Sequence, residues 1–221
     1  MSAEPDAVEI RVLGSLLEKQ RTTPEAYPLS INGLRLACNQ STNRDPVVAY
    51  DQPTVVAALE RLHRRGWTRM ASGAGSRARK YRHLVDRALD LGEADLAVLC
   101  VLMLRGAQTL GELKQRTERL HPLADLAAVE EVLDGLIRRE LAARLERRPG
   151  QKEQRFVQAL EGEVWSRASR SPIGAQAVDT RHPPVDGEHE TPVNEHRLDR
   201  LERELADLRA EVTSLREQLG G

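Results

Sequence analysis

The sequence predicts a mainly helical α+β protein made of two consecutive copies of one small unit, followed by a linker and a C-terminal helix. Three observations indicate this fold class. A 13-residue segment recurs at an offset of 74 residues, a pattern typical of a β-hairpin follows each copy, and leucines recur three and four residues apart near the end of the chain.

The repeated segment reads VVAALERLHRRGW at residues 55–67 and VEEVLDGLIRREL at residues 129–141. Two leucines and an arginine pair occupy the same positions in both copies. Apolar residues three to four apart lie on one face of a helix, which can then be buried. Each copy therefore predicts an amphipathic helix that keeps its arginines outside.

A short run that suits a β-strand follows each helix, at residues 67–71 and 141–146, and a second run follows after a turn. The first turn, residues 72–76, reads SGAGS, and its glycines can adopt the positive φ that hairpin loops need. The second turn is built around Pro149 and Gly150. A β-hairpin is the simplest interpretation of both segments.

Two more helices are expected before each repeated segment. The first helices are indicated by apolar stripes at Ile10, Leu13, Leu16 and Leu17 and at Leu96, Leu99, Leu102 and Met103. The second helices, at residues 30–39 and 109–119, open with Ser30 and Thr109, which suit an N-cap. The order helix, helix, helix, hairpin is that of a winged helix, a variant of the helix-turn-helix. We predict two winged-helix domains, at residues 1–88 and 89–160.

Between its second and third helices the first copy carries a polar loop, residues 40–52, whose role the residue types do not indicate. The run LGSLLEKQRTTPEAYPLSINGLRLACNQSTNRDPV, residues 13–47, contains part of this loop and resembles the signature of the YceH-like family, bacterial proteins of uncharacterised function. The repeat extends the resemblance to about Leu160. The resemblance implies two winged-helix domains packed together and implies no activity.

Residues 161–193 are polar and rich in proline, serine, histidine and acidic residues, which is typical of a flexible linker. Residues 194–221 form a heptad pattern typical of a coiled-coil helix. The apolar positions of this pattern are Leu198, Leu201, Leu205, Leu208, Val212, Leu215 and Leu219. The flanking charges would pair with opposite sign between two parallel chains, so we predict a parallel homodimer.

The alternative is that the C-terminal helix folds back onto its own chain, as apolar stripes commonly do. Sedimentation of the full chain beside a truncation ending at residue 193 distinguishes the two arrangements. We expect the full chain to sediment as a dimer and the truncation as a monomer. Both sedimenting as monomers would contradict the homodimer.

The composition excludes several classes of protein. The N-terminus lacks a basic segment followed by an apolar one, and the longest apolar run, residues 96–104, is far shorter than the roughly 20 residues of a membrane-spanning helix. Cys38 and Cys100 have no second ligand at zinc spacing and are interpreted as buried apolar residues. We predict a cytoplasmic protein with no membrane segment, metal or cofactor.

A basic segment from Arg61 to His83 contains eight lysines and arginines and no acidic residue. These are Arg61, Arg64, Arg65, Arg69, Arg77, Arg79, Lys80 and Arg82. In a winged helix they would lie on the third helix and the wing, where cations can contact the phosphates of double-stranded DNA. Asn43 and Arg44 of the polar loop are further candidates for this nucleic-acid-binding site.

Base reading has weaker support, because the helix beginning near Gln52 offers mainly Thr54, Ala57, Ala58 and Glu60 at its start. We therefore expect a DNA-binding, transcription-regulator-like protein of weak or shape-dependent specificity. Two alternatives stay open: a solvated basic face without a ligand, and a protein-interaction adapter that binds a protein partner on a tandem winged-helix scaffold. An enzyme is not expected, because no phosphate loop, nucleophile elbow or metal-ligand spacing is present.

Overall fold

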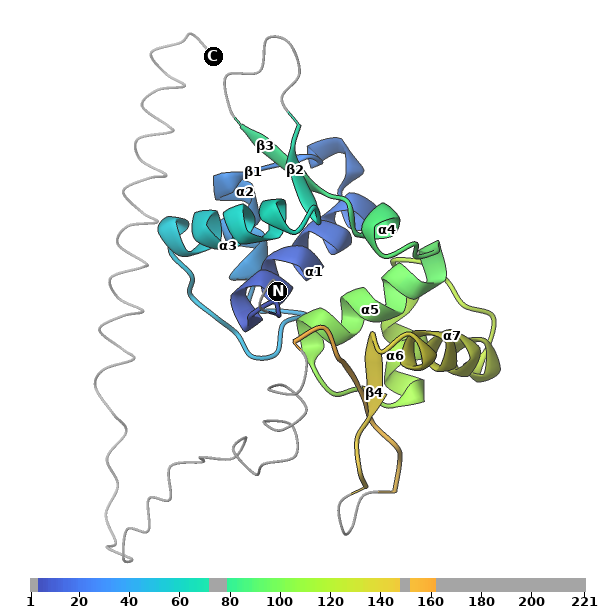
Figure 1. Cartoon of the computed structure of the whole chain (residues 1–221). Coiled ribbons are helices and arrows are strands. Elements are labelled where there is room, and N and C mark those ends of the chain that lie inside the picture. Colours follow the sequence, from blue (N-terminus) through green and yellow to red (C-terminus); the bar gives the residue numbers. More distant parts are fainter. Residues whose placement is uncertain (1–3, 72–78, 148–151, 162–221) are drawn as a thin grey trace, which may run out of the picture. The chain divides into compact units, whose positions relative to one another are not determined.

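The computed structural model describes residues 4–71, 79–147 and 152–161, which belong to one compact unit, Met1–Ala175 (Figure 1). Within these residues the chain combines helices with two small antiparallel sheets, so the predicted α+β class is confirmed. The predicted coiled-coil helix and the linker after Glu161 lie outside the described residues. None of the described helices is long and apolar enough to cross a membrane.

The first copy begins with three helices, and its third helix leads into a hairpin. Its elements are α1 (Ala7–Thr22), the 3-10 turn η1 (Pro24–Ala26), β1 (Leu29–Ser30), α2 (Ile31–Cys38), α3 (Gln52–Arg64), β2 (Thr68–Met70) and β3 (Lys80–His83). The central strand β3 pairs antiparallel with both β1 and β2. Strand β1 was not expected, because two residues are too few to give a sequence pattern.

The second copy follows after the short helix α4 (Val85–Ala88). Its elements are α5 (Glu93–Arg105), α6 (Leu110–Thr117), α7 (Leu126–Arg138), β4 (Ala142–Arg144) and β5 (Phe156–Gln158). Strands β4 and β5 pair antiparallel, as the predicted hairpin requires. The described residues thus contain the order helix, helix, helix, hairpin twice.

Side-chain caps fix where these helices begin. Ser30 and Thr109 cap α2 and α6 as predicted, each accepting a hydrogen bond from a backbone N–H of the first turn. Asp51 and Asp125 cap α3 and α7 in the same way. These two aspartates are 74 residues apart, so the internal repeat includes the cap as well as the apolar face of the third helix.

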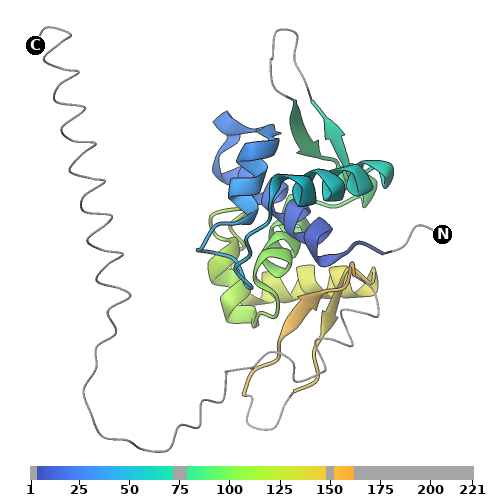
Figure 2. The ribbon, with the colours of Figure 1, turned by 90° about the vertical axis from the view of Figure 1, so that its left-hand side faces the viewer.

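The two copies share one continuous apolar core, at whose centre α1 and α5 lie side by side (Figures 1 and 2). Residues 9–18 of α1 and 96–104 of α5 are all buried, because other elements cover these helices on every side. Gly14 allows the close approach, since a Cβ there would lie 3.0 Å from Met103 Cβ. Cys38 and Cys100 are buried free thiols in this core.

Candidate nucleic-acid interface

The outer face of the β2–β3 hairpin carries a row of cations. Arg69 and Arg82 are directly opposite each other on neighbouring strands, and Lys80 shares the face of Arg82 because alternate residues of a strand point the same way. Like charges directly opposite in a sheet repel each other, and an external anion would relieve that repulsion. We call Arg69, Lys80 and Arg82 the cationic row.

The opposite face of the hairpin is held against the protein. Thr68 and His83 form the next cross-strand pair, and both are buried. The Thr68 hydroxyl donates to the backbone oxygen of Leu59 in α3 over 3.4 Å. Figure 2 shows the hairpin beside α3. Because strand side chains alternate, the cationic row lies on the face opposite Thr68 and His83.

Two arginines of α3 and its C-cap turn toward α1 instead of solvent. Arg61 donates from Nη2 to Asp6 over 2.6 Å and from Nε to Glu9 over 3.1 Å. Arg65 donates from Nε to Glu9 over 3.2 Å, and its guanidinium lies 5.9 Å from the centre of the Trp67 ring. Glu9 is buried, so these pairs hold α3 against the start of α1.

The other described members of the basic segment have no carboxylate partner among the residues that the structure describes. Arg64, Arg69 and Arg79 are exposed, while Lys80 and Arg82 are half-buried. Arg82 Nε is buried and has no hydrogen-bond partner in that part of the chain. Arg77 lies outside the described residues. Five of the eight predicted phosphate contacts therefore have no carboxylate partner among the described residues and are the candidates for contact with an external anion: Arg64, Arg79 and the cationic row.

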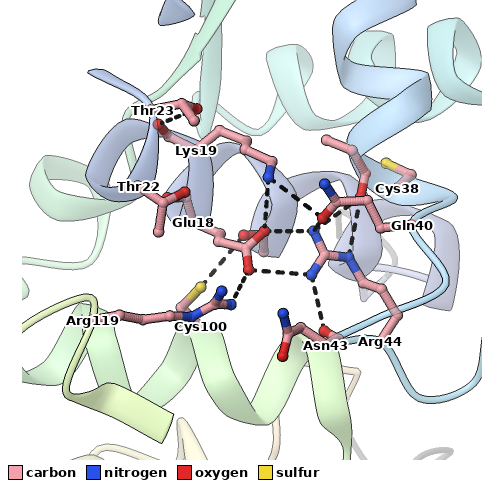
Figure 3. A network of polar contacts seen from close by, with 12 residues as sticks. Glu18, Lys19, Thr22, Thr23, Cys38, Gln40, Asn43, Arg44, Cys100 and Arg119 are labelled. Atoms are coloured by element: carbon pink, nitrogen blue, oxygen red, sulfur yellow. Dashed lines mark hydrogen bonds and ion pairs between the residues drawn. The ribbon is translucent and has the colours of Figure 1, made fainter. Parts of the chain in front are cut away.

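The prediction for the loop residues Asn43 and Arg44 requires correction. The Arg44 side chain is 0% exposed and donates to Glu18 over 2.5 Å and to the backbone oxygen of Ala37 over 2.9 Å (Figure 3). Asn43 is half-buried, and its side-chain oxygen accepts from Arg105. A buried guanidinium with internal acceptors cannot reach a phosphate, so Arg44 belongs to the architecture of the protein, whereas Asn43 is held by Arg105 and stays partly exposed.

The loop at residues 40–52 instead joins the two copies. The backbone N–H of Asp45 donates to the backbone oxygen of Leu104 in α5 over 2.8 Å. Glu18 of α1 accepts from Arg44 of the loop and also from Arg119 of the second copy (Figure 3). Burial raises the pKa of Glu18, but the hydrogen bond and charge of Arg44 outweigh it and hold the pKa below its usual value.

The start of α3 offers few groups that could read bases. Glu60 is exposed and Thr54 and Ala57 are half-buried, but Ala58 is fully buried, so its inclusion among the outward positions was wrong. Ala58 lies on the side of α3 that faces the core, which the helical period places next to Leu62. The outer surface of α3 therefore adds one carboxylate and no further cation before its last turn.

The equivalent surface of the second copy is different in charge. Helix α7 exposes Glu130 and Glu131 where α3 has Val56 and Ala57. Several of its cations have internal partners: Arg139 donates to backbone oxygens, Arg144 pairs with Asp134, and Arg155 pairs with Glu112. The two copies thus share a topology but not an electrostatic surface.

The fold and this surface define a class of small α+β proteins with a duplicated helix–hairpin unit and a cationic hairpin in the first copy. The chain belongs to the family described as protein of unknown function, DUF480, whose model matches residues 6–151. It is 50% identical over 174 residues to a UPF0502 protein of Geotalea daltonii, covering 78% of this chain and 79% of that protein.

Other UPF0502 relatives match a similar share of the chain. A protein of Geobacter metallireducens is 53% identical over 159 residues, covering 71% of this chain and 72% of that protein. A protein of Pseudomonas putida is 48% identical over 155 residues, covering 70% and 71%. These names state family membership and no biochemical activity.

Proposed function

We propose that the protein binds double-stranded DNA through the first copy, contacting phosphates with the cationic row, Arg64 and Arg79. The observation that carries the proposal is the direct opposition of Arg69 and Arg82, with Lys80 on the same face and no carboxylate partner among the described residues. Cations of such a row neutralise DNA phosphates, and the counterions that were condensed on the DNA are released, which favours binding.

The proposal includes a tandem winged-helix fold, as the resemblance to the YceH-like family also implies. Each copy has three helices and then a hairpin, and α3 would be the recognition helix with the β2–β3 hairpin as its wing. Arg64 lies at the end of α3 and the cationic row lies on the wing, so helix and wing each contribute cations to the proposed contact. Phosphate contacts carry no sequence information, so specificity would be weak or depend on DNA shape.

The test is fluorescence-anisotropy binding to a random-sequence duplex at several salt concentrations. Wild type is compared with the triple variant R69Q/K80Q/R82Q, which removes three charges but keeps side chains of similar bulk. We expect the triple variant to lose affinity by about 10- to 100-fold at low salt. Each phosphate contact contributes about 0.9 to the slope of log K against log salt, so the slope of the variant should be smaller in magnitude by about 2–3.

The matched control is R138Q/R147Q/K152Q, which removes the same charge from exposed positions of the second copy. Equal loss in both triple variants would mean that only overall charge matters and would contradict the proposed interface, as would no binding by wild type at low salt.

The second candidate function is a protein-interaction adapter, and an observation on α7 favours it for the second copy. Leu126 is 52% exposed at the start of this helix, and Glu130 and Glu131 are exposed one turn further on. An apolar side chain beside carboxylates suits a protein partner better than a phosphate backbone. One copy would then bind DNA and the other a protein, in a cytoplasmic homodimer formed through residues 194–221.

A further inference from the structure

A second group of arginines lines a cavity that is open to solvent, where the two copies meet. The cavity has a volume of about 340 Å³ and is lined by Asn43, Arg105, Gln115, Arg116, Glu118 and Arg119. Asn43 comes from the loop of the first copy, whereas the other residues come from the end of α5, from α6 and from the segment that follows α6. Its size is at the small end of the range for ligand pockets, about 300–1,000 Å³.

The carboxylates around this cavity are too few for its cations. Glu18 is shared by Lys19, Arg44 and Arg119. Glu112 is shared by Arg116 and Arg155, at 3.4 and 3.2 Å. Glu118 lines the cavity but pairs with Lys114 over 2.9 Å. Among the residues that the structure describes, positive charge is therefore in excess at the junction of the two copies.

Arg105 has the least compensation of the arginines that line the cavity. Its partner there is the neutral side-chain oxygen of Asn43, which accepts a hydrogen bond without supplying charge. Burial, together with the charges of Arg116 and Arg119, lowers the pKa of Arg105 below its usual value. Converging guanidinium groups repel each other, and an anion placed among them would convert that repulsion into attraction.

The ends of α5 and α6 offer another explanation, because cations near a helix C-terminus interact favourably with the helix dipole. Each helix end carries only about half an elementary charge, which is less than the charge of the arginines near it. The dipoles therefore account for part of the positive charge and leave an excess facing the cavity.

We propose that the cavity between α5, α6 and the loop at residues 40–52 binds a small phosphate-bearing anion, with Arg105 and Arg116 as its principal ligands. A guanidinium group can donate two parallel hydrogen bonds to two oxygens of one phosphate. Arg119 contributes charge while it holds Glu18. Because residues of both copies line the cavity, a bound anion stabilises their junction. The site is independent of the proposed DNA interface.

Pyrophosphate is the probe, and calorimetric titration of the full chain is the measurement. Sodium chloride at equal ionic strength shows how much of the effect is due to generic screening. We expect saturable pyrophosphate binding by wild type, at least tenfold weaker in R105Q/R116Q and unchanged in R138Q/R147Q, which removes the same charge from exposed positions of the second copy.

A second variant keeps the test valid if loss of Arg105 disturbs folding. Gln115→Glu places a carboxylate at the cavity without removing any arginine, and we expect at least tenfold weaker pyrophosphate binding. Gln52→Glu makes the same change at the exposed start of α3 and should leave binding unchanged. Equal binding by wild type and Gln115→Glu would overturn the proposal.

Duplex DNA distinguishes a small-anion site from an extension of the DNA surface. We expect R105Q/R116Q to bind duplex DNA as well as R138Q/R147Q does. If R105Q/R116Q loses duplex affinity and wild type does not bind pyrophosphate, the arginines contact the DNA backbone and the small-anion site is wrong. Failure of the DNA proposal alone would leave the pyrophosphate result unaffected, so the two outcomes are separable.

Discussion

Replacing Glu18 by alanine is expected to lower the free energy of unfolding by about 3–5 kcal/mol, the usual cost of removing one partner from a buried ion pair. Glu18 is 2% exposed and Arg44 is 0% exposed, so the substitution leaves a guanidinium charge in the interior without its carboxylate. Arg119 loses the same acceptor, which weakens the junction between the copies. Urea denaturation followed by circular dichroism measures the change.

Glu118→Ala is the matched control for this prediction. Glu118 is 58% exposed and pairs with Lys114 on the surface, so its loss should cost less than about 1 kcal/mol. The double variant E18L/R44M removes both buried charges and should recover much of the stability that E18A loses. If E18A and E118A are equally stable, or if the double variant is no better than E18A, charge burial is not the cause.

Acid is expected to destabilise the protein through His83. This side chain is 2% exposed, and burial lowers its pKa to about 4, against an unfolded value of about 6.5. Asp86 opposes the shift, with its carboxylate 3.6 Å from Nδ1, while Arg82 and Arg21 add to it. The neutral imidazole ring is instead hydrogen-bonded through Nε2 to the side-chain oxygen of Gln20.

The stability that depends on neutral His83 is present above pH 6.5 and is lost as the pH falls through about 4. The full contribution of neutral His83 to the free energy of unfolding amounts to about 3 kcal/mol. Glu161 acts in the opposite direction, because burial raises its pKa to about 7 and its contribution is lost as the pH rises toward that value. The pH profile of wild type alone therefore contains both effects.

Comparison with the His83→Gln variant isolates the contribution of His83 to the pH dependence of stability. Gln keeps a polar group near Gln20 but does not titrate, so the unfolding free energy of the variant should fall less than that of wild type between pH 7 and pH 4.5. An NMR titration should also give His83 a pKa near 4. A ring that titrates near 6.5, with parallel pH profiles for both proteins, would contradict the assignment.

The sequence alone determined the three main helices and the hairpin of each copy, but not the short elements η1, β1 and α4. Apolar residues three to four apart located the third helix of each copy, and Ser30 and Thr109 marked helix starts, because capping and amphipathic spacing are local properties of the chain. Hairpins were predictable for the same reason, since turn residues stand between short strand-like runs. The shared topology of the two copies followed from their repeat.

Only the tertiary structure decided which cations face solvent. Arg44 and Arg64 are both arginines in polar surroundings of the sequence, yet Arg44 is buried against Glu18 and Arg64 is exposed. Likewise Arg61 is bound by Asp6 and Glu9, which lie more than 50 residues earlier in the chain. An ion pair depends on distance in space, and sequence separation does not reveal it. The same holds for the arginine-lined cavity, whose residues come from the loop at 40–52 and from the end of α5 onward.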